Sequence, residues 1–171
     1  WRKMWEIIPD DNFGLNLDPS HLILQMIDYE RVVREFGSKI FHVHAKDTEM
    51  YERNLPATGV LDTKPYTDER NRSWIFRTCG YGHGERWWRE FASTLRMFGY
   101  DYVLSIEHED SLMSPDEGLT KAAAFLNGAV IRQQPTAASV PSATAIAVAA
   151  VATITLSTTL LRHAGSRISA W

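Results

Sequence analysis

The sequence contains one cysteine, has no excess of basic residues and begins without a signal-peptide pattern. Because Cys79 has no second cysteine to pair with, an intrachain disulfide is excluded, and a reducing setting, the cytoplasm, is expected. The formal net charge of −3 provides no basic surface, so no nucleic-acid partner is expected. The 171 residues are also too few for a complete α/β barrel, which needs about 250.

What is present is typical of a globular domain. Hydrophobic residues make up 44% and charged residues 23%, which is enough apolar material for a core. Residues 1–8 have the pattern of the latter part of an amphipathic helix, and residues 9–11 (Pro-Asp-Asp) end it. We expect the domain to begin before Trp1.

Three segments, residues 13–18, 39–47 and 102–109, show the two-residue alternation of β-strands. Each has one apolar face, which fits packing against helices, and one mostly small or polar face, which fits a polar interior or cleft. For any one strand, the alternative is a two-sided sheet with its polar face in water. The apolar faces contain Phe13, Leu15, Leu17, Phe41, Val43, Ala45, Tyr102, Leu104 and Ile106, and the polar faces contain Asn16, Asp18, His42, His44, Lys46, Ser105, Glu107 and Glu109.

Helical patterns follow these strands. After a turn at residues 18–20, the spacing of Leu22 and Met26 predicts a helix that runs to about Phe36, with Gly37 at its C-terminal cap. Strands that alternate with helices pair in parallel through right-handed crossovers. The sequence therefore predicts an α/β fold with a parallel sheet.

Two further helices are predicted downstream. Residues 85–98 form one, which Gly99 closes, and residues 114–117 (Ser-Pro-Asp-Glu) are a capping box that starts another, to about Leu126. The long polar segment at residues 48–84 is expected to be a functional lid or an insertion.

The composition changes after the folded domain at residues 1–130. In the tail at residues 131–171, residues 133–161 carry no charge and consist mainly of Ala, Thr, Val and Ser. We favour a poorly ordered or weakly helical tail. A membrane anchor through residues 143–161 and a non-native extension stay open, although six hydroxyl side chains make that span only marginally apolar.

Asp18 and His21 stand where the first strand passes into a turn. A carboxylate at a strand end can bind a divalent cation, and an imidazole one turn later can contact a substrate oxygen on that cation. The structural alternative is that Asp18 caps its own turn, as Asp before Pro-Ser often does.

His42 and His44 share one face of the second strand, and His44 lies nearer its C-terminal end. We therefore expect His44 at a site and His42 one layer deeper, as a hydrogen-bonded core histidine. Lys46 and Asp47 follow, and they either serve a substrate oxygen or pair with each other.

Glu107 and Glu109 close the third strand on its polar face, with Glu107 the deeper of the two. An isolated acidic strand end is usually only solvated. If the three strands are neighbours, however, Asp, His and Glu side chains meet at one end of the sheet. That ligand set suits Mn²⁺, Mg²⁺, Co²⁺ or Zn²⁺, without a choice among them.

Other chemistry-bearing residues give weaker signals. Nothing near Cys79 marks a base that would make it a catalytic thiol. The glycines of residues 80–84 (Gly-Tyr-Gly-His-Gly) do not follow a strand and lack a Lys-Ser/Thr ending, so they fail the phosphate-loop templates. The arginines of the long polar segment fit a solvated loop better than an anion clamp; they are Arg53, Arg70, Arg72 and Arg77.

Four motifs together resemble a known family. They are residues 17–22 (Leu-Asp-Pro-Ser-His-Leu), 41–47 (Phe-His-Val-His-Ala-Lys-Asp), 82–88 (Gly-His-Gly before Trp-Trp) and 105–110 (Ser-Ile-Glu-His-Glu-Asp). They resemble the sugar phosphate isomerase/epimerase family of xylose isomerase-like (β/α)8 barrels, which is related to the endonuclease IV fold. The resemblance covers residues 1–130 and implies the last three strands of a TIM barrel, strands six to eight, without its N-terminal half.

The resemblance also implies a site. In that family a divalent metal is held by Glu, Asp, His and a second Glu, and Asp18, His44 and Glu107 match the last three of these. His21 matches the histidine that contacts the sugar, and Glu107 would be one of two bases that move a proton through an enediolate. The first Glu is expected before Trp1. Met50 stands about where some members have an arginine, which leaves the substrate open.

Three hypotheses follow from the sequence. The first is a metal-dependent sugar isomerase or epimerase, inactive in this portion alone, with a small-molecule sugar as its partner. The second is a DNA-repair endonuclease of the same fold, against which the acidic net charge counts. The third is a non-enzymatic or membrane-tethered relic. The sequence leaves the oligomeric state open.

Overall fold

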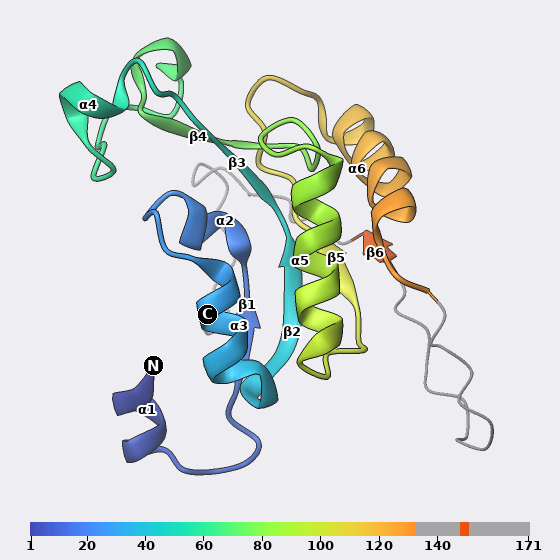
Figure 1. Ribbon diagram of the computed structural model, residues 1–171. Coiled ribbons are helices and arrows are strands. Elements are labelled where there is room, and N and C mark those ends of the chain that lie inside the picture. Colours follow the sequence, from blue (N-terminus) through green and yellow to red (C-terminus); the bar gives the residue numbers. More distant parts are fainter. Residues whose placement is uncertain (133–147, 151–171) are drawn as a thin grey trace, which may run out of the picture.

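Three parallel strands lie at the centre of the structure, as the alternation predicts (Figure 1). The computed structural model describes residues 1–132 and 148–150. Strands β1 (Leu15–Leu17), β2 (Ile40–Ala45) and β5 (Leu104–Ile106) lie side by side in that order, and β6 (Val148–Ala150) pairs in parallel with β5. Among the described residues the sheet is open, with β1 at one edge and β6 at the other.

The register places the polar faces of the strands next to one another. Asn16 pairs with His42, and His44 pairs with Ser105. Because parallel strands end at the same edge of a sheet, the side chains that follow β1, β2 and β5 meet there.

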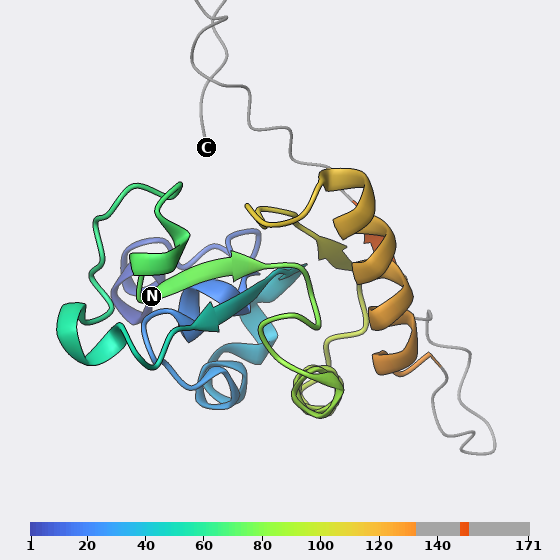
Figure 2. The ribbon, with the colours of Figure 1, turned by 90° about the horizontal axis from the view of Figure 1, so that it is seen from above.

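Helices cover the apolar face of the sheet. Figure 2 shows α3 (Tyr29–Phe36) and α5 (Glu85–Met97) side by side on that face, and α6 (Pro115–Ala129) packs beyond α5. The Ser114 hydroxyl accepts from the Glu117 N–H, so the predicted N-cap of α6 is confirmed. The return bond of a capping box is not formed among the described residues, since the Glu117 carboxylate pairs with Lys121. Deeply buried core residues include Leu17, Val33, Val43, Ala45, Trp88, Phe91, Leu95, Leu104, Ile106, Ala122 and Leu126.

The prediction of one helix to Phe36 is wrong, because α2 (Pro19–Ile23) and α3 are separate. Between them Met26 adopts φ 58° and is 71% exposed, so its helical spacing from Leu22 does not reflect burial. The Asp28 carboxylate caps α3 by accepting from the Glu30 N–H at 2.9 Å, which gives α3 its own start. Gly37 has φ −52° and begins a 3-10 turn instead of forming a left-handed cap.

Two aromatic residues predicted on the apolar faces are exposed instead. The pairing of β1 with β2 has a bulge, since Leu15 pairs with Ile40 while Asn16 pairs with His42. The extra residue, Phe41, is therefore 44% exposed, and Ile40 is buried in its place. Tyr102 precedes the short strand β5 and is 59% exposed.

The long polar segment contains strands that the sequence analysis did not predict. The chain passes from β2 directly into β3 (Asp47–Met50), which pairs antiparallel with β4 (Trp74–Arg77). The short helix α4 (Leu55–Thr58) lies between them. This two-stranded sheet, the β3–β4 hairpin, projects from the C-terminal edge of the parallel sheet (Figure 1).

The N-terminal helix is confirmed as α1 (Arg2–Ile7), and Trp1 and Trp5 pack their rings against Phe36. The predictions of a disordered, weakly helical or membrane-anchoring tail concern residues that mostly lie outside the described part, apart from the three residues of β6. In the described part of the chain no helix is both long and apolar enough to cross a bilayer.

Candidate metal centre

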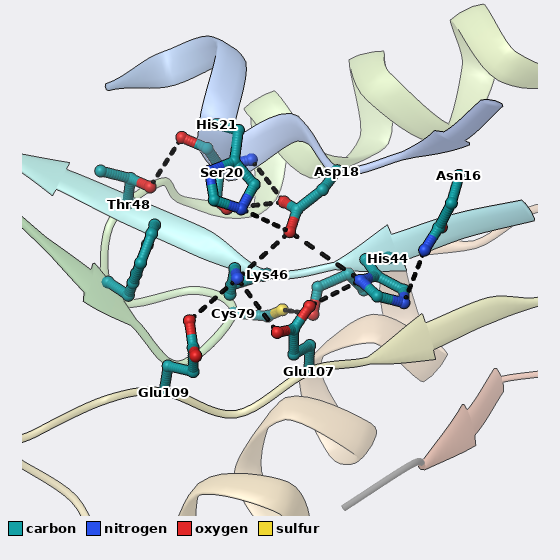
Figure 3. A network of polar contacts seen from close by, with 12 residues as sticks. Asn16, Asp18, Ser20, His21, His44, Lys46, Thr48, Cys79, Glu107 and Glu109 are labelled. Atoms are coloured by element: carbon teal, nitrogen blue, oxygen red, sulfur yellow. Dashed lines mark hydrogen bonds and ion pairs between the residues drawn. The ribbon is translucent and has the colours of Figure 1, made fainter. Parts of the chain in front are cut away.

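Asp18, His44 and Glu107 meet at the C-terminal edge of the parallel sheet (Figure 3). Asp18 follows β1, His44 lies in β2 and Glu107 follows β5. One potential ligand atom from each lies within 4.8 Å of the others. Ligand atoms that share a divalent ion at about 2.1 Å lie up to about 4.2 Å apart, so the three could close around an ion with shifts below about 1 Å.

The two oxygens of Asp18 have different surroundings. Oδ1 accepts from the Ser20 N–H at 2.8 Å and from the Ser20 hydroxyl at 2.6 Å, so Asp18 also caps α2. Oδ2 lies 3.6 Å from His21 Nε2 and 3.9 Å from His44 Nδ1. The turn-capping alternative and the ligand hypothesis are therefore compatible, since each uses a different oxygen.

His44 is held at both ring nitrogens. Its Nδ1 lies 2.5 Å from Glu107 Oε2, and its Nε2 lies 3.1 Å from the Asn16 side-chain amide. The carboxylates of Asp18 and Glu107 raise the pKa of His44 to about 9. Asn16 was not among the predicted site residues, although it belongs to the predicted polar face. It orients the ring so that Nδ1 faces the two carboxylates.

Both carboxylates stay ionised and can serve as ligands. The hydrogen bond from His44 outweighs burial and lowers the pKa of Glu107. Burial raises the pKa of Asp18, but His44, Lys46 and Ser20 together lower it below its ordinary value. A pair of ionised carboxylates with an imidazole is a ligand set for a divalent cation.

Lys46 lies inside this cluster and is 2% exposed. Its Nζ lies 3.2 Å from Asp18 Oδ2, 3.2 Å from Glu107 Oε1 and 2.9 Å from Glu109 Oε2. The prediction that Lys46 pairs with Asp47 is wrong, because the partners of its ammonium are Asp18, Glu107 and Glu109. A role of Lys46 toward a substrate oxygen stays a prediction. Burial lowers its pKa, but the carboxylates more than offset this and raise it.

The other predicted residues lie around the cluster. His21 is largely exposed, and its ring meets the edge of Phe76 with centroids 5.5 Å apart. His42 lies two residues before His44 on β2, and its Nε2 lies 2.7 Å from the Ser105 hydroxyl, so the predicted hydrogen bonding is confirmed, but the ring is only half-buried and is not a core residue. Burial, and then the charge of His44, lowers the pKa of His42.

Asp47 begins a separate cluster that the sequence analysis missed. Its side chain is fully buried and accepts from the backbone N–H groups of Thr48, Gly80, Gly82 and His83 at 2.8–3.2 Å. His83 Nδ1 lies 2.8 Å from the same carboxylate, and Trp88 Nε1 donates to it at 3.2 Å. The glycine-rich turn thus forms an anion-binding nest for the chain's own carboxylate.

Cys79 and two arginines of the long polar segment gave weaker signals in the sequence, and their contacts in the structure account for them. The Cys79 thiol is fully buried and donates to the Ala45 carbonyl at 3.2 Å. Burial raises its pKa well above the ordinary range, so it is no nucleophile. Arg72 and Arg77 are not solvated loop residues: Arg72 is buried against Tyr66 and Trp74, and Arg77 is ion-paired.

Comparisons with known proteins agree with this geometry. The model of a family described as "Xylose isomerase-like TIM barrel" matches residues 1–129. A protein of Bacillus subtilis (strain 168), named "Uncharacterized protein YfiH", is 48% identical over 107 residues, which is 62% of this chain. The matched part spans 34% of the length of that relative.

Proposed function

The chain belongs to the xylose isomerase-like TIM barrel family, and from this premise we propose that it supplies the metal centre of a sugar isomerase or epimerase. The observation that supports this most is the meeting of Asp18, His44 and Glu107 at the C-terminal strand ends. In TIM barrel enzymes this is the edge at which active sites lie. We also propose that β1, β2 and β5 are the last three strands of such a barrel.

The proposed reaction moves a proton on the carbon next to a carbonyl group. A divalent metal, when bound, supplies Lewis-acid polarisation of the substrate oxygens. Glu107 acts as a general base that removes the proton from that carbon. A proton then returns either to the former carbonyl carbon, which gives isomerisation, or to the opposite face of the same carbon from a second base, which gives epimerisation. Because its pKa is lowered, Glu107 is ionised and ready to accept the proton at neutral pH.

The two carboxylate oxygens of Glu107 contact different neighbours. Oε1 contacts Lys46, and Oε2 faces His44 and the ligand position. Lys46 therefore limits rotation of the carboxylate. His21, which is exposed beside Asp18, is placed to hydrogen-bond a substrate oxygen.

A fourth ligand, a second glutamate, completes the proposed centre. We place it on a strand next to β1, because the outer edge of β1 has no partner strand among the described residues. A glutamate there would face Glu107 across the substrate, so that one base removes the proton and the other returns it on the opposite face. Two bases on opposite faces of the substrate favour epimerisation, whereas an isomerisation can proceed with one base.

Turnover is the test of this proposal. Because the chain spans about a third of the relative's length, the assay uses the natural gene product that contains this sequence. It is loaded with Mn²⁺ and screened against ketoses and aldoses, with solvent deuterium incorporation next to the carbonyl as the readout. Glu107→Gln is expected to reduce exchange at least about 10³-fold with an unchanged fold. Exchange at the wild-type rate in Glu107→Gln would exclude the role of this residue as a base.

A further inference from the structure

A hollow of about 380 Å³ opens beside the candidate metal centre, between the β3–β4 hairpin and the segment after β5. We name it the side hollow. Its volume lies within the range of small-molecule pockets. Its lining consists of Tyr66, Phe76, His108, Glu109, Asp110 and Ser111.

Two residues connect the side hollow directly to the metal centre. The ring centroid of Phe76 lies 4.4 Å from Lys46 Nζ, and the same ring touches His21. Glu109 reaches the cluster through its 2.9 Å contact with Lys46. A ligand that extends from the metal past His21 would therefore meet Phe76 and Glu109 next.

The aromatic side of the hollow is fixed in place. The Tyr66 hydroxyl donates to the Glu109 carbonyl at 3.3 Å and accepts from the Phe76 N–H at 2.7 Å. Burial raises the pKa of Tyr66 to about 12, so it remains a neutral phenol. With the hydroxyl occupied, Tyr66 and Phe76 offer ring surface, against which the C–H face of a sugar can pack.

The polar side of the hollow favours hydroxyl groups over an anion. Arg77 is paired with Asp110 at 3.2 Å and with Glu49, and Lys46 is taken up by its carboxylates. Around the hollow, Arg77 and Lys46 are thus already paired with carboxylates of the described residues, which disfavours a phosphate because its strongest hydrogen bonds come from Arg and Lys. Glu109 Oε2 contacts Lys46, and the remaining acceptor positions of the carboxylate suit the donors of a diol.

We propose that the side hollow holds the end of the substrate remote from the metal, and that this end is an uncharged polyol or sugar ring, not a phosphate ester. The inference rests on the proposed function and names its substrate class. Phe76 and Glu109 are the residues that determine this specificity, the first by ring contact and the second by accepting hydroxyl donors.

Binding of two probes tests the inference without requiring turnover. D-fructose and D-fructose 6-phosphate are titrated by calorimetry into the Mg²⁺-loaded natural gene product. We expect D-fructose to bind at least about tenfold more tightly, which corresponds to about 1.4 kcal/mol. Phe76→Leu, which keeps apolar volume but removes the ring, and Glu109→Gln are each expected to weaken it at least about fivefold. Tyr102→Ala, which removes an aromatic ring at the opposite end of β5, is the matched control and should bind like the wild type.

The outcomes separate this inference from the proposed function. Equal or tighter binding of the phosphate ester, unaltered binding in both variants, or binding of neither probe overturns the inference. D-fructose binding that depends on Phe76 but occurs without deuterium exchange of any sugar supports the hollow and contradicts the isomerase proposal. Deuterium exchange of a sugar phosphate that is unaffected by Phe76→Leu supports the isomerase proposal and contradicts the inference about the side hollow.

Discussion

Two aspartates at the same edge of the sheet, Asp18 and Asp47, are used in different ways. Asp47 receives six donors, four of them backbone N–H groups, which exceeds the roughly four acceptor positions of a carboxylate. Asp18 receives two donors from Ser20 on Oδ1, while Oδ2 faces only the ionisable side chains of the cluster.

The difference shows how to separate a structural from a functional buried carboxylate. A carboxylate saturated by fixed backbone donors has no acceptor position left for a ligand. Removing it destabilises the folded state. A carboxylate with one oxygen facing only charged side chains can exchange those groups for a metal. By this criterion Asp47 anchors the turn at residues 80–84, and Asp18 belongs to the site.

Replacing Asp47 should have the largest effect. Asp47→Ala leaves buried donors unpaired, so we expect the free energy of unfolding to fall by about 3–5 kcal/mol. Urea denaturation monitored by tryptophan fluorescence measures this loss, since Trp88 donates to Asp47. A loss under about 1 kcal/mol would remove the distinction between the two aspartates.

Replacing Lys46 should have the next largest effect, and a metal should reverse it. Lys46→Met leaves Asp18, Glu107 and Glu109 without their shared cation, which is expected to cost about 2–3 kcal/mol of stability. Mn²⁺ at about 100 times its dissociation constant should restore about 2.7 kcal/mol. Thermal unfolding with and without Mn²⁺ measures both quantities. Lys121→Met, at an exposed ion pair on α6, serves as the control: without Mn²⁺ it should be as stable as the wild type, and with Mn²⁺ it should gain as much stability as the wild type does.

The protonation of His44 predicts how metal binding varies with pH. Its folded-state pKa of about 9 is above its ordinary value of 6.5, so the proton stabilises the metal-free fold below about pH 6.5 and this contribution is lost as pH rises through about 9. The metal must displace that proton. We therefore expect Mn²⁺ affinity to rise about tenfold per pH unit between pH 7 and 9, with release of about one proton. Calorimetry in buffers of different ionisation enthalpy counts the proton; pH-independent affinity would show that His44 is not a ligand.

The smallest effect is expected from Ser20→Ala. This change removes the hydroxyl donor to Asp18 Oδ1 but keeps the backbone donor of the same residue. Stability should fall by about 1 kcal/mol, and Mn²⁺ affinity should change less than about threefold. A larger effect on affinity than on stability would mean that both oxygens of Asp18 belong to the site.

The elements with local signals were predictable from the sequence. The strands follow from alternation and the start of α6 from its Ser-Pro N-cap, because both depend on residues within a few positions of each other. The exposure of Phe41 was not predictable, since the bulge depends on pairing with β1. The separate start of α3 at Asp28 had a local signal that the spacing of Leu22 and Met26 obscured.

The sequence predicted which residues form the site but not which contacts they make with one another. Alternation placed Asp18, His44, Lys46 and Glu107 on the polar face, and the structure brings all four together. The partners of Lys46 come from two other strands, so the sequence could not show which carboxylates it contacts. The donors to Asp47 likewise lie 33–41 positions away, in the turn at residues 80–84 and at Trp88. The glycines of that turn do not fit a phosphate loop, so this contact had no signal in the sequence.

Titration of Mn²⁺, followed by electron paramagnetic resonance, tests the central claim most directly. The natural gene product is compared with Asp18→Asn, His44→Gln and Glu107→Gln, and with Glu117→Gln at an exposed helix pair as the control. We predict one bound Mn²⁺ in the wild type and the control, and dissociation constants raised at least about 100-fold in the three site variants. Equal affinity in all five proteins, or no saturable binding in the wild type, would contradict the assignment of Asp18, His44 and Glu107 as a metal centre.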